Sequence, residues 1–214
     1  MLSQEELNRY DRQILIPEIG REGQEKLKKA RVFVAGAGGL GSPVSLYLAV
    51  AGLGHIRIAD HDVVDPSNLN RQVLHWPKDI GRLKVDSARE KLSEINPNAK
   101  IEITSMTINE KNISSMTDGF DAIVDAMDNF PARYILNRMA VQKNIPFFYG
   151  AVRGLEGRAM TIIPGNPSIF PAALATIFST MVFPIFLLTP FLPEMVSINS
   201  TSPCIWYYKS YGFS

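Results

Sequence analysis

Cysteine is almost absent from this 214-residue chain, which contains only Cys204. One cysteine cannot form a disulfide framework or an all-cysteine zinc site, and it suits a reducing cytosol. An excess of positive charge is also missing, because 22 Lys and Arg residues nearly balance 21 Asp and Glu residues, for a net charge of +1. Such a chain lacks the basic footprint of a nucleic-acid-binding protein or of a helix that lies on an anionic membrane. We therefore expect no nucleic-acid partner.

Charge is scarce in the last part of the chain, where Glu194 and Lys209 are the only charged residues after Arg158. The average of 20% charged residues therefore hides a break between a charged part and an almost uncharged one. The length fits one domain with an appendage. We predict one domain over residues 1–165 and an irregular apolar segment over residues 166–214.

The N-terminus lacks the basic and apolar regions of a secretory signal peptide, so we expect a cytoplasmic protein. Ser3 followed by Glu6 is instead a capping box, which predicts a short helix carrying Leu7 and Tyr10.

Residues 31–150 alternate strand-like apolar runs with helical segments. Strands are expected at 31–35, 56–59, 101–103, 120–126 and 146–150, and helices at 40–51, 84–95 and 132–143. Strands joined by helices predict an α/β, Rossmann-like, doubly wound and mostly parallel sheet. Ligands bind such a sheet outside the carboxyl ends of its strands. We therefore expect the site near Gly36–Gly41, Asp60 and Asp125–Asn129.

A glycine-rich motif, Gly36-Ala37-Gly38-Gly39-Leu40-Gly41, directly follows the first of these strands and precedes a helix. Its spacing lets the backbone approach a pyrophosphate, whose charge would lie at the N-terminus of the helix. Asp60 ends the second strand, where a carboxylate can accept hydrogen bonds from ribose hydroxyls. Alone, the motif suggests a nucleotide and most naturally NAD; a glycine turn kept only for packing is the alternative.

Cations and a carboxylate around this motif favour a triphosphate over a dinucleotide. Arg71 and Lys84 would neutralise phosphate oxygens, and Asp128 would hold hydrated Mg²⁺. The alternatives are a solvated surface arginine, a lysine on a helix surface, and an aspartate that only caps the next helix.

The combination of motifs resembles the ThiF/MoeB/HesA family, prokaryotic relatives of ubiquitin-activating enzymes, over about residues 7–165. The motifs are Arg9-Tyr10-Asp11-Arg12-Gln13, Gly36–Gly41, Ser67–Gln72, Gly81-x-x-Lys84, and Asp125–Asn129 with Arg133. The resemblance implies that ATP and Mg²⁺ are used to adenylate the C-terminal glycine of a small ubiquitin-like sulfur-carrier protein, for thiamine or molybdopterin synthesis. A carboxylate is already a nucleophile, so this half-reaction needs no general base and depends on positioning and charge neutralisation.

The resemblance also implies the residues of the site. Those that bind ATP would be Gly36, Gly38, Gly39, Gly41, Asp60, Ser67, Asn68, Leu69, Asn70, Arg71, Lys84, Asp128 and Asn129. Those that act in catalysis would be Arg12, Arg71, Lys84 and Asp128. Asp128 would coordinate Mg²⁺, and Arg12 would reach the triphosphate from the other subunit of a homodimer. An NAD-dependent oxidoreductase and a nucleotide-binding pseudoenzyme are the two alternatives.

The C-terminal part departs from the family pattern. Ala173 and Thr176 stand where family members carry a zinc-binding cysteine pair, so we expect no zinc. Residues 169–192 contain no charge and three prolines, which argue against one straight membrane helix. A segment buried in the sheet or dimer interface is favoured over a disrupted tail and over membrane contact.

The three histidines, His55, His61 and His75, have neither metal-ligand spacing nor cysteine partners. We expect structural or surface roles for them.

Overall fold

The computed structural model describes residues 1–153, 156–164, 197–198 and 204–211. Positions 173 and 176, where the resemblance implies a zinc-binding cysteine pair, and the uncharged segment 169–192 lie outside these residues. Among the residues that are described, no helix is both long enough and apolar enough to cross a membrane.

The elements follow one another as the hydrophobic pattern predicts. The strands are β1 (Arg31–Ala35), β2 (His55–Ala59), β3 (Lys100–Thr104), β4 (Ala122–Asp125), β5 (Phe147–Arg153), β6 (Glu156–Pro164), β7 (Ser197–Ile198) and β8 (Cys204–Tyr211). The α-helices are α1 (Gln4–Arg9), α2 (Asp11–Ile14), α3 (Gly20–Lys29), α4 (Gly41–Val50), α5 (Lys84–Ile95), α6 (Ile113–Met116) and α7 (Phe130–Lys143). Two 3-10 helices, η1 (Pro66–Asn68) and η2 (Pro77–Asp79), lie between β2 and α5. All five predicted strands and all three predicted internal helices are confirmed, and the Ser3–Glu6 capping box opens α1.

The strands form one sheet in the order β3-β2-β1-β4-β5-β6-β8-β7. Strands β1 to β5 pair in parallel, and the chain order reverses direction between β1 and β4. This confirms the doubly wound Rossmann-like sheet. The switch point beside β1 brings the ends of β1 and β4 together, with Ala35 opposite Asp125. Ligands bind at such a point in open α/β sheets.

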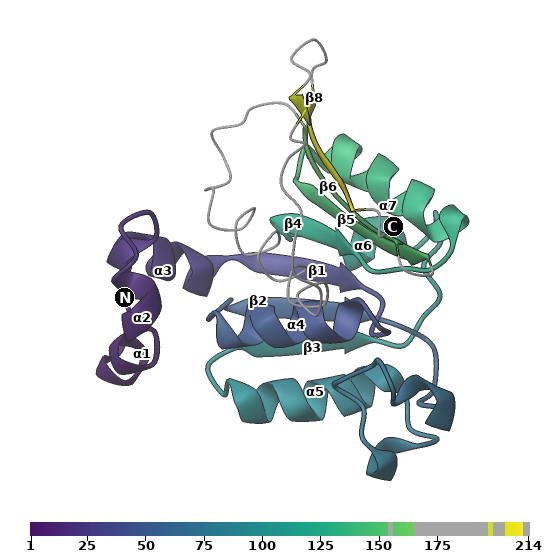
Figure 1. Cartoon of the computed structure of the whole chain (residues 1–214), viewed down its shortest axis with the longest axis horizontal. Coiled ribbons are helices and arrows are strands. Elements are labelled where there is room, and N and C mark those ends of the chain that lie inside the picture. The colour runs from purple at the N-terminus through teal and green to yellow at the C-terminus, as the bar shows by residue number, and fades with distance from the viewer. Residues whose placement is uncertain (154–155, 165–196, 199–203, 212–214) are drawn as a thin grey trace.

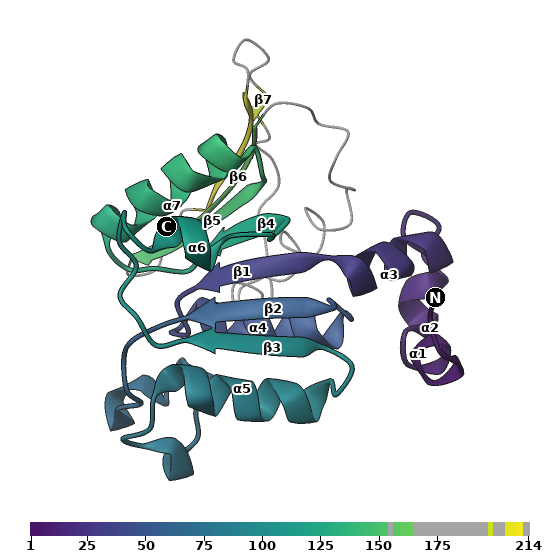
Figure 2. The ribbon, with the colours of Figure 1, turned by 180° about the vertical axis from the view of Figure 1, so that it is seen from behind.

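Helices cover both faces of the sheet because side chains alternate along each strand. Val32 and Val34 of β1 belong to the core cluster beneath α4 and α5, whereas Phe33 and Ala35 belong to the cluster beneath α6 and α7. Figure 1 is viewed from the side of the sheet that α4 covers, and Figure 2 is viewed from the side that α6 and α7 cover. The central strands β1, β2 and β4 are almost entirely buried between these layers, which explains their continuous apolar runs.

The antiparallel end of the sheet was not predicted. Strand β6 runs antiparallel to β5, and β8 pairs antiparallel with β6 from Gly157–Tyr211 to Pro164–Cys204. Part of the segment expected to be irregular therefore joins the sheet. The alternation of strands and helices along the sequence does not predict β8, because the pairing of β8 depends on the free edge that β6 offers.

The N-terminal helices are held against the domain by buried amides. The side chain of Asn96, at the end of α5, donates hydrogen bonds to the Tyr10 hydroxyl (2.9 Å) and to the Ala49 carbonyl (2.8 Å). Gln24, which is fully buried in α3, donates to the Ala51 carbonyl at 2.9 Å. These contacts attach α1–α3 at the end of the sheet where β1 begins (Figure 1).

The substitution Asn96→Ala should lower the free energy of unfolding by about 1–3 kcal/mol, because it leaves the buried Ala49 carbonyl without this donor and detaches the Tyr10 hydroxyl. Urea unfolding measures the loss. The matched control is Asn98→Ala, whose side chain is exposed two residues later. Equal stability of the two variants would contradict the docking role of Asn96.

Candidate active site

The glycine loop, residues 36–41, owes its shape to its first and last glycines. Gly36 has a positive φ of 99°, and a Cβ atom there would lie 2.7 Å from the Ala126 carbonyl oxygen. A Cβ atom on Gly41 would lie 1.9 Å from the Gly36 carbonyl oxygen. These two glycines allow the loop to pack against itself and against the turn that follows β4.

The middle of the glycine loop is open, unlike its ends. A Cβ atom on Gly38 or Gly39 would meet nothing closer than 3.7 Å, and the nearest atoms belong to the Gln72 and Arg71 side chains. Within the described residues, the N–H groups of Gly38, Gly39 and Leu40 form no hydrogen bond. Free N–H groups before a helix, with room for a ligand beside them, make an anion-binding site.

Asp60 ties the end of β2 to the glycine loop. One of its carboxylate oxygens accepts a hydrogen bond from the Ala37 N–H at 2.8 Å, and the other accepts from the Asp62 N–H at 2.8 Å. Each carboxylate oxygen has a further lone pair for a ligand hydroxyl.

Arg71 lies beside the middle of the glycine loop. Its Cγ and Cδ atoms are the nearest neighbours of a Cβ atom built on Gly39. Its exposed guanidinium donates hydrogen bonds to the Ser67 carbonyl (2.8 Å) and to Asn70 Oδ1 (3.0 Å). The segment from 67 to 70 therefore orients the arginine.

Other side chains of this segment make local contacts. Asn68 Oδ1 accepts a hydrogen bond from the Asp65 N–H at 3.1 Å and completes the capping box of η1, and Leu69 is half-buried.

Lys84 opens α5 and is buried, with 6% of its surface exposed. Its ammonium donates a hydrogen bond to Asp62 Oδ2 at 2.8 Å. This hydrogen bond lowers the pKa of Asp62. The alternative of a surface lysine is therefore wrong. The position of Lys84 is fixed by a carboxylate two residues beyond Asp60.

The residue that caps α7 after the end of β4 is Asn129 and not Asp128. Asn129 caps α7, since its Oδ1 accepts a hydrogen bond from the Ala132 N–H at 3.0 Å. The alternative in which Asp128 caps this helix is therefore wrong. The Asp128 carboxylate is exposed and receives only a long contact, 3.5 Å, from Asn129 Nδ2.

Asp125 and Gln72 are two further buried polar residues near the glycine loop. Both belong to the sequence motifs, but the sequence alone assigned no role to either. Asp125 is 1% exposed, and its Oδ2 atom has no hydrogen-bond partner among the described residues. Burial raises the pKa of Asp125 to about 6, against the hydrogen bond from the Met127 N–H and the charge of Arg133. Gln72 is 4% exposed, and its Oε1 atom likewise has no partner in the described part of the chain.

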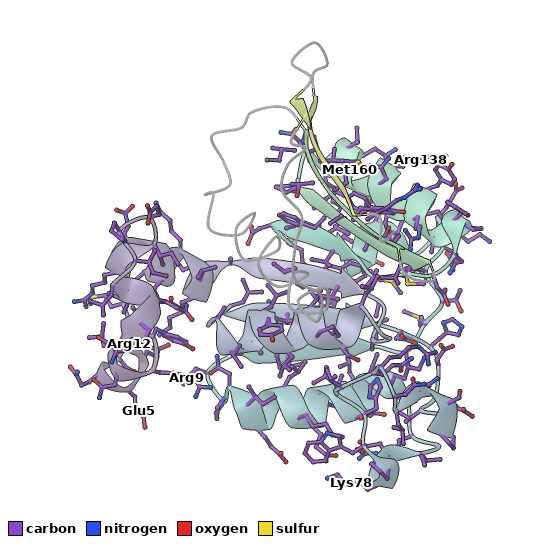
Figure 3. The ribbon with its side chains drawn as sticks, in the orientation of Figure 1. Glu5, Arg9, Arg12, Lys78, Arg138 and Met160 are labelled. Carbon is purple, nitrogen blue, oxygen red and sulfur yellow. The ribbon has the colours of Figure 1, made fainter. Side chains whose placement is uncertain are left out.

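Arg12 is the predicted site residue that the fold does not bring to the others. Its side chain is 91% exposed on α2, at the end of the sheet where β1 begins, whereas the glycine loop follows the opposite end of β1. Figure 3 labels Arg12 on the N-terminal helices. Within one chain, the structure therefore gathers the loop, Asp60, Arg71, Lys84 and Asp128, but not Arg12.

We expect the buried carboxyl of Asp125 to impose a pH dependence on stability. Its folded pKa of about 6 lies above its ordinary value, so its contribution is present at low pH and is lost as the pH rises towards about 6. The loss is on the order of 3 kcal/mol. Urea unfolding between pH 4 and 8 should show this fall in the wild type and not in Asp125→Asn. The exposed Asp118→Asn variant is the control, and parallel profiles for the wild type and Asp125→Asn would refute the assignment.

Known proteins are similar to this chain in both sequence and fold. The SAMP-activating enzyme E1 of Haloferax volcanii is 42% identical over 171 residues, which cover 78% of this chain and 63% of that protein. The sulfur carrier protein adenylyltransferase of Thermus thermophilus is 42% identical over 156 residues, which cover 73% and 58%. The crystal structure of Escherichia coli MccB with ATP matches with a TM-score of 0.60 and 29% identity, covering 64% of this chain and 40% of that one. The chain thus spans about three fifths of the length of the two curated relatives.

The ThiF family profile matches residues 10–183. This range includes the glycine loop, the segment that carries Arg71, the start of α5 and the turn after β4. The chain belongs to the ThiF family.

Proposed function

We propose that this chain is an ATP-dependent adenylyltransferase that activates the C-terminal glycine of a small ubiquitin-like sulfur-carrier protein, in a thiamine or molybdopterin type of pathway. The observation that carries the proposal is the open centre of the glycine loop, whose free N–H groups lie beside Arg71. The names of the two relatives, a SAMP-activating enzyme and a sulfur carrier protein adenylyltransferase, support the same reaction. We place the reaction in the cytoplasm.

The proposed nucleotide site follows the carboxyl ends of β1, β2 and β4. The triphosphate lies against the N–H groups of the glycine loop, where Arg71 and Lys84 neutralise its oxygens. Asp60 accepts hydrogen bonds from the ribose hydroxyls through lone pairs that the backbone leaves free. The complete set of residues proposed to line the nucleotide is Gly36, Gly38, Gly39, Gly41, Asp60, Ser67, Asn68, Leu69, Asn70, Arg71, Lys84, Asp128 and Asn129.

Asp128 fits the role of a magnesium ligand because its carboxylate is exposed and free of the helix cap. Mg²⁺ in nucleotide sites is held through one or two carboxylates, phosphate oxygens and several waters. When bound, it would supply charge neutralisation to the phosphates.

The chemistry requires no base from the protein. A carboxylate oxygen of the carrier's terminal glycine attacks the α-phosphorus and forms the new P–O bond of an acyl-adenylate. The bond from the α-phosphorus to the bridging oxygen breaks, and that oxygen leaves with pyrophosphate. The chain contributes position and positive charge where negative charge accumulates on the leaving group.

A homodimer would complete the site. Arg12 is exposed and lies at the opposite end of β1 from the glycine loop of its own chain, although a triphosphate benefits from a further cation. We propose that Arg12 acts at the site of the partner subunit. In a two-fold symmetric dimer, the same contact occurs twice.

Pyrophosphate exchange into ATP, with a Gly-Gly-ended carrier present, tests the reaction. We expect exchange by the wild type and its loss, to about a hundredth or less, in Lys84→Ala and Asp128→Ala, because each removes a charge that stabilises the transition state. Arg89→Ala, an exposed arginine on the same helix as Lys84, is the control that should retain exchange. ATP binding without exchange would favour a pseudoenzyme, and affinity for NADH without affinity for ATP would favour an oxidoreductase.

Mixing two inactive variants tests whether Arg12 acts across the dimer. Arg12→Ala and Lys84→Ala should each be inactive alone, while a random mixture should recover about a quarter of wild-type exchange, since half of the dimers are mixed and each has one intact site. Wild-type chains diluted with either variant calibrate subunit mixing. If Arg12 acted within its own chain, mixing would restore nothing.

A further inference from the structure

A buried chain of hydrogen bonds connects α5 to the glycine loop. The His75 ring is 3% exposed, with Nε2 2.9 Å from the Ala37 carbonyl oxygen and Nδ1 2.9 Å from Ser87 Oγ. Ser87 Oγ accepts a hydrogen bond from the Lys91 ammonium at 3.0 Å, and Lys91 forms an ion pair with the fully buried Asp79. None of these groups belongs to the proposed adenylation chemistry.

The direction in which these hydrogen bonds are donated follows from the acceptor at each end, the Ala37 carbonyl and the Asp79 carboxylate. A backbone carbonyl can only accept, so the proton of a neutral His75 lies on Nε2 and is donated to Ala37. Nδ1 then accepts from the Ser87 hydroxyl, whose oxygen accepts from Lys91. Asp79 holds Lys91 in place and also accepts hydrogen bonds from the Trp76 N–H (2.9 Å) and from Arg82 (2.8 Å).

The carbonyl that His75 contacts belongs to the peptide group between Ala37 and Gly38. In a trans peptide, the C=O and the following N–H lie in one plane and point in opposite directions. A hydrogen bond that holds the Ala37 carbonyl inward therefore directs the Gly38 N–H outward, towards the open centre of the loop. The Ser42 hydroxyl holds the same carbonyl at 2.9 Å, and Asp60 holds the Ala37 N–H. Because Gly38 has no side chain, little else opposes a flip of this peptide.

We propose that His75, in its neutral Nε2–H form, is a positioning residue that orients the Ala37–Gly38 peptide for phosphate binding. The inference rests on the proposed function, since the phosphates are those of ATP. His75 touches no substrate and acts only through the glycine loop.

The charges around His75 agree with a neutral ring. Burial lowers the pKa of His75, and the ammonium groups of Lys84 and Lys91 on α5 lower it further, against the Ala37 carbonyl and the Asp60 carboxylate. A second proton on Nδ1 would also need an acceptor. Ser87 Oγ already accepts from Lys91, and its own proton would then have to turn from Nδ1 to the Leu74 carbonyl at 3.4 Å or to the Asp79 carboxylate, whose pKa a hydrogen bond from Ser87 lowers.

The test compares three variants in the full chain. His75→Phe keeps a ring but removes both hydrogen bonds, whereas His75→Gln keeps an amide N–H donor for the Ala37 carbonyl. Val73→Phe is the control, because it introduces the same ring at an exposed position of the same segment. Amide hydrogen exchange, without nucleotide, is followed at Ala37 and Ser42, whose N–H groups bond to Asp60 and to the Gly38 carbonyl.

We expect His75→Phe to speed exchange at these two amides and to weaken ATP·Mg²⁺ binding by about tenfold, the cost of one orienting hydrogen bond. His75→Gln should lie between it and the wild type, and Val73→Phe should match the wild type. Nitrogen NMR of the wild type should show the neutral Nε2–H tautomer at pH 6. Unchanged loop exchange in both His75 variants, or the other tautomer, would overturn the assignment.

Two outcomes separate this inference from the proposed function. If the wild type binds no ATP, the proposed function fails, while loop exchange still tests the role of His75. If the wild type binds ATP and folded His75→Phe binds it equally well, the positioning role fails alone. Where His75→Phe does not fold, His75→Gln and Ser87→Ala carry the same comparison.

Discussion

One peptide group, between Ala37 and Gly38, sets the geometry on which the candidate site depends. Its carbonyl accepts hydrogen bonds from His75 and Ser42, and the N–H of Ala37 donates to Asp60. These donors and acceptors come from three separate segments: the end of β2, the segment before α5 and the start of α4. Glycines leave room for a phosphate, but they also leave the backbone free to turn, so the surrounding side chains must supply the order that a Cβ atom would otherwise give.

Several buried ionisable side chains lie near the carboxyl ends of the strands. Lys84 is paired with Asp62, Lys91 is paired with Asp79, and Asp125 is buried with one oxygen unpartnered among the described residues. Ion pairs that are buried, such as Lys91–Asp79, or half-buried, such as Lys84–Asp62, add little net stability, because desolvation and solvent screening offset much of their attraction. Their clustering around the glycine loop is therefore better explained by the need to fix groups that bind a charged ligand, since perturbed ionisable groups gather at functional sites.

The layout of the chain also separates the parts of the site. The site residues other than Arg12 lie beyond the carboxyl ends of the strands: the glycine loop, Asp60, Arg71, Lys84 and Asp128. Arg12 lies on helices attached at the opposite ends of the strands, where β1 begins. The antiparallel addition of β6 and β8 lengthens the sheet away from the switch point, so it leaves the carboxyl ends of β1, β2 and β4 unobstructed by strand pairing. A second copy of the chain is the simplest source of the missing cation under the proposed function.

The sequence by itself determined the strands from 31 to 150, the helices between them and the motifs at the strand ends, because hydrophobic periodicity and motif spacing are local properties. It could not determine which side chains pair. The contacts of His75 with Ala37, of Lys84 with Asp62 and of Asn96 with Tyr10 span 38, 22 and 86 positions. Burial decided that Lys84 is not a surface lysine and that Asp125 holds its proton unusually tightly, since both effects depend on neighbours that only packing supplies. Tertiary structure also placed Arg12 away from the loop, because the N-terminal helices lead directly into the start of β1 whereas the glycine loop follows the end of that strand.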